Sequence, residues 1–385
     1  MDRTLELDVT TQLLDVLAHP TMSTGDRTLE LPASDYTDPD RWARERTRLF
    51  GEIPLLAGLS GELAAPGDWK LFEPPGASIM LVRGDDGVVR GFRNSCRHRG
   101  ALVVEQPRGS NRSFTCPYHS WTYDRQGALV GLPQSETFPG VCREERGLGA
   151  VSVRERDGAI WVLPGSAGEP FDLDRHLGEL GPELARWDLG GLHFFEQREH
   201  RVRANWKLAL DSFTEAYHIP NLHKGSVGLL AAGGLNVTTA FGRHHRQTLA
   251  MKPLKEIPRI APEEWAPFAT GAIAFVYIVF PNTTLLFFGD HAEVLQVFPG
   301  DTIDTSVTLQ SMFDYAPIES DERRANLTAV FDYFYNVIGT EDYRMAAGVQ
   351  RMLASSPPGE TFLLGRCESV TQAMHLAFRG IVADG

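Results

Sequence analysis

The sequence has few cysteines, no long apolar run and no excess of positive charge. Only 4 of its 385 residues are cysteine, so we expect no disulfide framework, and a chain of this length can bury a core without one. No apolar run approaches the roughly 18 residues of a membrane span, and Met1 to Thr11 shows no signal-peptide pattern. The formal net charge of −13 argues against binding to nucleic acid or anionic membranes. These absences favour the reducing cytoplasm, where cysteines serve metal or redox chemistry before disulfides.

Glycine-rich nucleotide loops are also missing. The chain contains neither a G-x-G-x-x-G pattern nor a P-loop, the motifs that place backbone N–H groups against phosphates. We therefore expect NAD(P)H and flavin to bind to other proteins, and the chain alone to be inactive with NADH.

The pattern of strands and helices changes along the chain. From about Trp69 to Pro164, short strand patterns flank tight turns such as Gly84-Asp-Asp-Gly87, which predicts a small antiparallel β module. Further on, strand patterns are followed by helices, which predicts an α+β fold with an antiparallel sheet. The later strands are expected at 237–248, 272–280, 283–288, 293–298 and 302–314, and the helices at 320–337, 341–354 and 370–382.

Two short pairs of metal-type ligands lie in the β module. One residue separates Cys96 from His98, two separate Cys116 from His119, and 17 residues lie between the pairs. A structural zinc site is possible by ligand count, but zinc patterns usually pair Cys with Cys and His with His. One Cys and one His on each loop favour a Rieske [2Fe–2S] cluster, because each loop can then supply one ligand to each iron.

The two motifs carry a family resemblance. Cys96-Arg-His98-Arg-Gly100 and Cys116-Pro-Tyr-His119-Ser-Trp121 closely resemble the Rieske motif of the alpha subunits of ring-hydroxylating oxygenases. The motif by itself also fits a simple electron carrier, which would have the cluster but lack a second iron.

A second group of ligand-type residues follows about 100 residues later. Asp211, Glu215 and His218 are spaced i, i+4 and i+7, so on one continuous helix they would share a face. Pro220 should end that helix, which lets the chain turn and bring His223 beside His218. Two histidines and one carboxylate with open positions form the ligand set of non-haem Fe(II) oxygenases. The alternative is a helix end with satisfied polar side chains, and a di-iron bundle would need a second Glu-x-x-His copy.

This stretch resembles the same family. The resemblance implies that His218 and His223 are iron ligands, and that Glu215 replaces the family's bridging acid, usually aspartate, which links the iron to the Rieske histidine of a neighbouring subunit. The family often has asparagine where this chain has Ser212.

A third ligand is expected from the segment Thr340-Glu341-Asp342-Tyr343. The resemblance implies that Asp342 completes the metal site, with Glu341 as the second choice. The alternative is that these acids compensate the dipole at a helix N-terminus, where acids are common.

The resemblance covers about residues 40–380 and implies three segments. These are an N-terminal segment with a helix that packs on the catalytic domain in 1–50, a Rieske domain in 51–165, and a helix-grip-like catalytic domain with mononuclear iron in 166–385. The expected activity uses O2 and electrons passed through the cluster to mono- or cis-dihydroxylate an aromatic or other apolar small molecule. Oxidative N- or O-demethylation would use the same metal sites, and the motifs do not select the substrate.

The resemblance also implies partners. Electrons would come from a ferredoxin, an NAD(P)H-dependent reductase or both, and the family usually forms trimers, some with a small beta subunit. Between Gly91 and Arg125, six arginines stand against two acids. This local excess of positive charge is either a solvated loop surface or a docking patch for an acidic redox partner.

Overall fold

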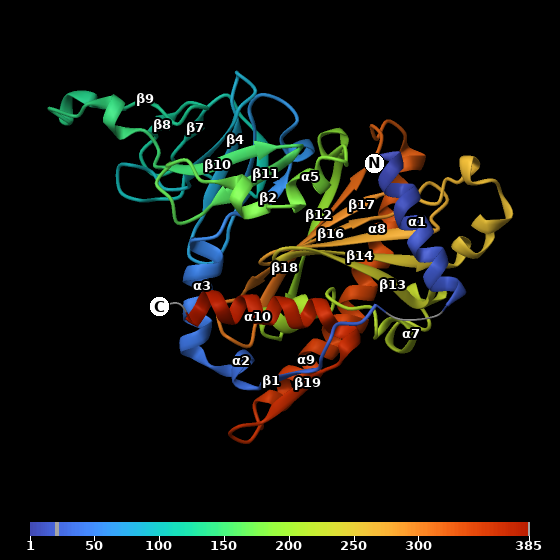
Figure 1. Ribbon diagram of the computed structural model, residues 1–385. Helices are drawn as coiled ribbons and strands as arrows, with labels where there is room; N and C mark the ends of the chain where they lie inside the picture. Colours follow the sequence, from blue (N-terminus) through green and yellow to red (C-terminus); the bar gives the residue numbers. More distant parts are fainter. Residues whose placement is uncertain (20–22, 384–385) are drawn as a thin grey trace. The chain divides into compact units, whose positions relative to one another are not determined.

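The computed structural model describes residues 1–19 and 23–383, and it divides into two compact units (Figure 1). The β unit comprises Arg46–His176 and Leu189–Gly191, and the α+β unit comprises Met1–Glu45, Leu177–Asp188 and Leu192–Gly385. Within the described residues, no helix is both long and apolar enough to cross a membrane.

The β unit contains two antiparallel sheets, as the turn pattern predicted. The larger has the order β2-β11-β10-β5-β4-β3-β6 and the smaller β7-β8-β9. Gly87, with φ of +77°, takes the left-handed conformation that the turn between β4 and β5 needs. The strands are β2 Leu55–Leu59, β3 Asp68–Phe72, β4 Ile79–Arg83, β5 Val89–Arg93, β6 Arg108–Ser110, β7 Phe114–Thr115, β8 Thr122–Tyr123, β9 Leu129–Gly131, β10 Ala150–Arg156 and β11 Ala159–Leu163.

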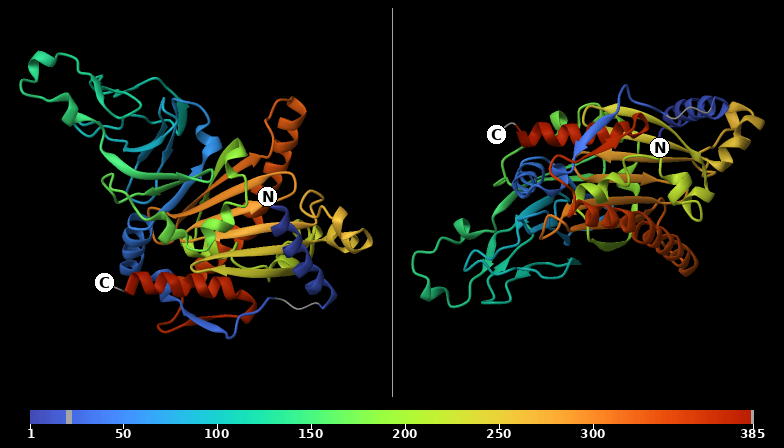
Figure 2. Two further views of the ribbon diagram at one scale, coloured as in Figure 1. Left: turned by 45° about the horizontal axis from the view of Figure 1, so that its top comes forward. Right: turned by 90° about the horizontal axis from the view of Figure 1, so that it is seen from below.

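The α+β unit is built on one seven-stranded antiparallel sheet of order β12-β18-β17-β16-β15-β14-β13. Figure 2 shows these strands as one layer, with the helices outside it. The expected α+β class with an antiparallel sheet is therefore confirmed. The strands are β12 His193–Val202, β13 Ala231–Phe241, β14 His244–Met251, β15 Ile273–Val279, β16 Thr283–Phe287, β17 Ala292–Pro299 and β18 Ser306–Asp314.

Helices and one small sheet complete the chain. The helices are α1 Arg3–Ala18, α2 Ser34–Thr37, α3 Pro39–Gly51, α4 Leu173–Leu177, α5 Leu180–Leu184, α6 Trp206–Asp211, α7 Ile219–Leu222, α8 Asp321–Val337, α9 Tyr343–Leu353 and α10 Ser369–Ala383. A two-stranded sheet pairs β1 Leu29–Pro32 with β19 Thr361–Leu364. Between α8 and α9 the chain stays helical, because Ile338–Asp342 forms a π-helical turn.

Both faces of the large sheet are covered, which is why every residue of β15 is buried. On one face, Tyr277 and Phe287 pack against Trp187, whose ring stacks on Phe287 with centroids 3.9 Å apart. On the other face, Val276 and Leu286 line a cavity. The alternation of side chains along a strand thus separates a structural face from a cavity face.

One strand prediction was wrong. The segment 237–248 is two strands rather than one, because β13 ends at Phe241 and β14 begins at His244. Gly242 between them has φ of +65°, a left-handed conformation that turns the chain back on itself.

Candidate metal centres

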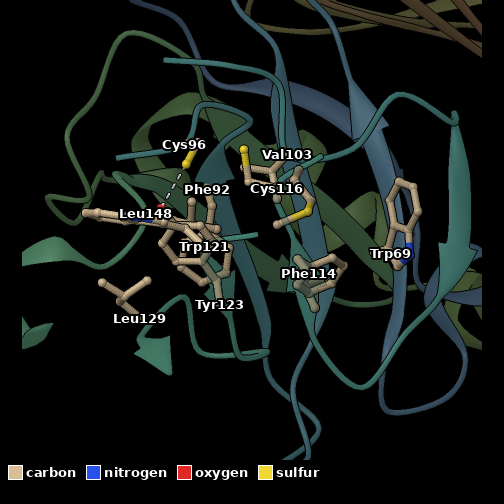
Figure 3. Packing of buried hydrophobic residues seen from close by; sticks show 12 residues of the cluster. Trp69, Phe92, Cys96, Val103, Phe114, Cys116, Trp121, Tyr123, Leu129 and Leu148 are labelled. Atoms are coloured by element: carbon tan, nitrogen blue, oxygen red, sulfur yellow. Dashed lines mark hydrogen bonds between the residues drawn. The ribbon is translucent and has the colours of Figure 1, made fainter. Parts of the chain in front are cut away.

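The cysteines of the first motif lie on two tight loops of the β unit. Cys96 accepts a hydrogen bond from Gly100 N at 2.9 Å, and Cys116 accepts one from Ser120 N at 3.0 Å, both through the main-chain oxygen. Gly100 and Ser120 have φ of +80° and +57°, and this left-handed backbone closes each loop. Figure 3 shows both cysteines among the buried side chains of one cluster, which includes Trp121.

The histidines of the motif complete a donor set for two metals. The rings of His98 and His119 lie 4.6 Å apart between centroids, and His98 stacks on Trp121 at 5.0 Å. His98 Nδ1 is buried and has no hydrogen-bond partner, which a buried polar atom rarely lacks unless it has a ligand. Desolvation, together with the charges of His119 and Arg99, lowers the pKa of His98 and so favours the neutral ring that binds a metal. These features fit a Rieske cluster.

The spacing of the second motif suggested one continuous helix, but its residues do not lie on one. α6 ends at Asp211, and the chain turns through Ser212–Thr214 before α7 begins at Ile219. Thr214 Oγ1 donates to the Asp211 carbonyl at 3.0 Å, and Gln247 Nε2 donates to the Phe213 carbonyl at 3.3 Å. One local and one tertiary hydrogen bond thus satisfy carbonyls that a longer helix would have used.

The predicted role of Pro220 needs the same correction. Pro220 does not end a helix but lies in the first turn of α7, where a missing N–H is tolerated. His218 is the residue before this short helix and His223 the residue after it. Their rings consequently lie edge to face with centroids 5.0 Å apart, which is the proximity that the sequence predicted.

Three side chains converge as a candidate metal site. One ligand atom from each of His218, His223 and Asp342 lies within 4.8 Å of the others. Asp342 Oδ1 is 3.6 Å from His218 Nε2 and 3.2 Å from His223 Nε2. Asp342 comes from the π-helical turn and is only 5% exposed. Burial among three donors that face one point fits a facial ligand set.

Carboxylates hold the opposite side of both imidazoles. His218 Nδ1 lies 2.5 Å from Glu215 Oε1, and His223 Nδ1 lies 2.7 Å from Glu341 Oε2. Ser226 Oγ also donates to Glu341 Oε2, at 2.8 Å. A carboxylate at Nδ1 fixes the ring and leaves Nε2 for a metal. Glu341, the second choice as a ligand, therefore lies behind His223 rather than among the three converging donors.

Asp211 does not join the metal donors. Its carboxylate accepts from Tyr36 Oη at 2.9 Å and lies 3.0 Å from His375 Nε2. Burial and the negative charge of Asp211 raise the pKa of Tyr36 well above its ordinary value, so the phenol stays a hydrogen-bond donor. This contact ties α6 to α2 and α10, and no local pattern in the sequence indicated it.

A small apolar chamber adjoins the three converging donors. Its volume is about 110 Å³. Its polar lining residues outside the metal motif are Ser212, which stands where the family often has asparagine, and Gln247. Much of the wall is aromatic or aliphatic, including Phe213, Phe288 and Phe334. From the family resemblance, some residues of the run 271–280 were expected to line an apolar cavity, and Ala274 and Val276 of β15 do so. The chamber residues of β14 and β16 were missed by sequence reasoning, because their alternation marks core and cavity walls alike.

Comparison with known proteins assigns the class that the fold and the two donor sets suggest. Residues 54–143 match the Rieske [2Fe-2S] domain, and residues 189–384, about half of the chain, match the catalytic domain of the ring hydroxylating alpha subunit. The chain belongs to this family, the catalytic subunits of Rieske non-haem iron oxygenases. Membership implies one [2Fe–2S] cluster and one mononuclear Fe(II) per subunit, and both donor sets fit them.

Curated relatives include enzymes with different substrates. The chain is 31% identical over 230 residues to the glycine betaine monooxygenase oxygenase subunit of Chromohalobacter salexigens, which covers 58% of this chain and 51% of that protein. It is 34% identical over 199 residues to the biphenyl 2,3-dioxygenase alpha subunit of Rhodococcus jostii, and this match covers 50% of this chain and 43% of that protein. The chain thus spans about half the length of these relatives.

Solved structures share the fold. The quaternary ammonium Rieske monooxygenase CntA in complex with L-carnitine has a TM-score of 0.76 at 20% identity, over 94% of this chain and 97% of that one. Naphthalene 1,2-dioxygenase from Rhodococcus sp. has a TM-score of 0.71 at 19% identity, over 98% of both chains. At these identities the likeness concerns the fold alone.

Proposed function

We propose that the chain is the oxygenase component of a Rieske system that hydroxylates an apolar small molecule at a mononuclear Fe(II). The observation that carries this proposal is the convergence of His218, His223 and Asp342 beside an apolar chamber. An electron carrier would need neither the second donor set nor the chamber.

The residues have distinct roles in this proposal. His218 and His223, through Nε2, and Asp342 hold one side of the metal, which leaves the chamber side for O2 and substrate. Glu215 and Glu341 hold the two Nδ1 protons and keep the rings in place. The apolar wall excludes water and orients the substrate. When bound, the cluster supplies electrons and the Fe(II) supplies the oxygen chemistry. Monohydroxylation consumes O2, two electrons and two protons, and it releases water.

We also assign Glu215 a role between subunits. Glu215 is only partly buried, so its carboxylate can accept a further hydrogen bond while it holds His218. Such a bond would link the iron site to the Rieske histidine of a neighbouring subunit in a homotrimer. The expected ferredoxin or reductase would dock near the exposed side chains of Arg97, Arg99 and Arg112 on the β unit. A cytoplasmic location stays a prediction.

Oxidative demethylation is the second candidate. It is favoured by the relatives named as monooxygenases of glycine betaine and carnitine. The aromatic rings of Phe213, Phe288 and Phe334 in the chamber wall could also face a methylated ammonium group. The apolar lining nevertheless favours a neutral substrate.

The test is reconstitution with a ferredoxin and reductase, followed by a product screen over arenes, aromatic acids, and N- or O-methyl compounds. The purified chain should contain about three irons for every two sulfides, a ratio that follows from one Rieske cluster plus one mononuclear iron. His218→Asn should remove one iron in three and abolish product while the cluster's absorption stays. A preparation with equal iron and sulfide and no product would refute the proposal.

A further inference from the structure

Two cavities of very different size share part of their lining, and the smaller one contacts the candidate metal donors. The inner chamber, which contacts His218, His223 and Asp342, has a volume of about 110 Å³, and the outer chamber has about 760 Å³. Three side chains line both: Met251 at the end of β14, Phe288 after β16, and Phe334 on α8. These three side chains therefore lie where the two chambers adjoin, and we call this place the constriction.

The inner chamber is too small for a whole substrate of ordinary size. An engineered apolar cavity of about 150 Å³ is known to bind benzene, so about 110 Å³ admits at most one ring or a short alkyl group. Small-molecule pockets generally measure about 300–1,000 Å³, a range that includes the outer chamber. Most of a ligand's surface would therefore be buried outside the constriction.

The outer chamber has a mainly apolar wall with a few charged or titratable residues. Its apolar side chains include Ile273 and Val330, and Lys252, Asp290 and His291 also line it. His291 Nδ1 lies 2.7 Å from Asp290 Oδ1. Burial opposes a charge on this ring, but the hydrogen bond with Asp290 and the carboxylate of Glu293, 3.6 Å from Nε2, prevail and raise its pKa to about 9. The charge of His291 is thus balanced by its own neighbours, and the chamber offers a ligand mainly apolar surface.

We propose that the substrate is an extended, mainly apolar molecule whose reacting end is no bulkier than one ring. This inference rests on the proposed function and specifies its substrate class. The reacting end passes Met251, Phe288 and Phe334 into the inner chamber, and the remainder occupies the outer chamber. The constriction thereby selects a terminal position for reaction and discriminates against molecules that are bulky at both ends.

The experiment measures binding rather than turnover. Equilibrium dialysis of the iron-loaded full chain compares toluene, which has a single ring and one methyl group, with n-butylbenzene, which adds three methylene groups. If the chain of n-butylbenzene lies in the outer chamber, this probe should bind at least about tenfold more tightly than toluene, because each buried methylene adds hydrophobic free energy.

Matched substitutions test whether the higher affinity for n-butylbenzene comes from the outer chamber. Ala269 and Ala329 are exposed and line only the outer chamber. Ala269→Trp or Ala329→Trp should reduce n-butylbenzene affinity about tenfold and leave toluene within about twofold. Ala325 lies one turn before Ala329 on α8, is exposed and lines neither chamber. Ala325→Trp should therefore change neither affinity.

Two results would overturn the inference. One is equal affinity for toluene and n-butylbenzene, and the other is a preference for n-butylbenzene that survives both outer-chamber substitutions. Neither result bears on the iron count or on the product screen. If the iron count and the product screen fail but the expected binding pattern is found, the proposed function is refuted and the two-chamber binding site is supported.

Discussion

Glu341 offers a sharp test of how the candidate iron site is held. Its Oε2 accepts from Ser226 Oγ and lies 2.7 Å from His223 Nδ1. Glu341→Gln keeps the shape and one acceptor oxygen but removes the charge that strengthens the bond to the ring. Loss of such a partner generally weakens metal affinity by about 10- to 100-fold, which corresponds to about 1.4–2.7 kcal/mol.

The assay is anaerobic titration of Fe(II) against a chromophoric chelator. Glu322→Gln is the control. Glu322 is exposed on the first turn of α8, so this substitution removes the same charge at a position away from the site. Asp342→Asn should lose far more affinity than Glu341→Gln, because it removes a proposed ligand. The reasoning is refuted if Glu341→Gln matches the control. If instead Glu341→Gln abolishes Fe(II) binding and Asp342→Asn retains it, Glu341 rather than Asp342 is the carboxylate ligand.

Three further predictions concern the cluster, a buried ion pair and pH. Cys96→Ser should abolish the visible absorption of the Rieske cluster, whereas Cys142→Ser, an exposed thiol, should leave the spectrum unchanged. Lys207 Nζ lies 2.5 Å from Glu45 Oε2 and both are almost fully buried. Because Arg41 Nε still holds Glu45 Oε1 at 3.0 Å, Lys207→Met should cost about 1.5–3 kcal/mol in urea unfolding. The pKa of His291 is raised from 6.5 to about 9 in the folded protein. Its protonation therefore adds to the free energy of unfolding, fully below about pH 6.5, and this addition is lost as the pH rises through about 9. The free energy of unfolding should fall by about 3 kcal/mol across that window, and a urea series in which His291→Gln shows the same fall would contradict the assignment.

The donor sets were predictable because their spacing is local. The Cys-x-His and Cys-x-x-His pairs each fit one short loop, so the sequence alone limits their geometry. His218 and His223 were also paired correctly, although for a different reason from the one expected. The carboxylate Asp342 came from family resemblance, since no spacing rule connects it with histidines more than a hundred residues earlier.

The errors arose where distant contacts outweigh local preference. The segment 205–218 has a helical spacing, yet Asp211 is held by Tyr36 and His375 from both ends of the chain. Helix propensity contributes fractions of a kcal/mol per residue, and tertiary contacts readily exceed it. The helix α1 was not predicted. The role of Glu341 behind His223 also depends on tertiary position, which no periodicity reveals.

The π-helical turn at Ile338–Asp342 makes this part of the chain sensitive to length. A π turn holds one residue more than the ordinary helix around it. Deleting a single residue there would let α8 and α9 merge into a regular helix and swing everything beyond by about 100°. The acid at 342 would then be carried around the axis and away from its two histidines. Insertions and deletions in this stretch should therefore be far less tolerated than changes of residue type.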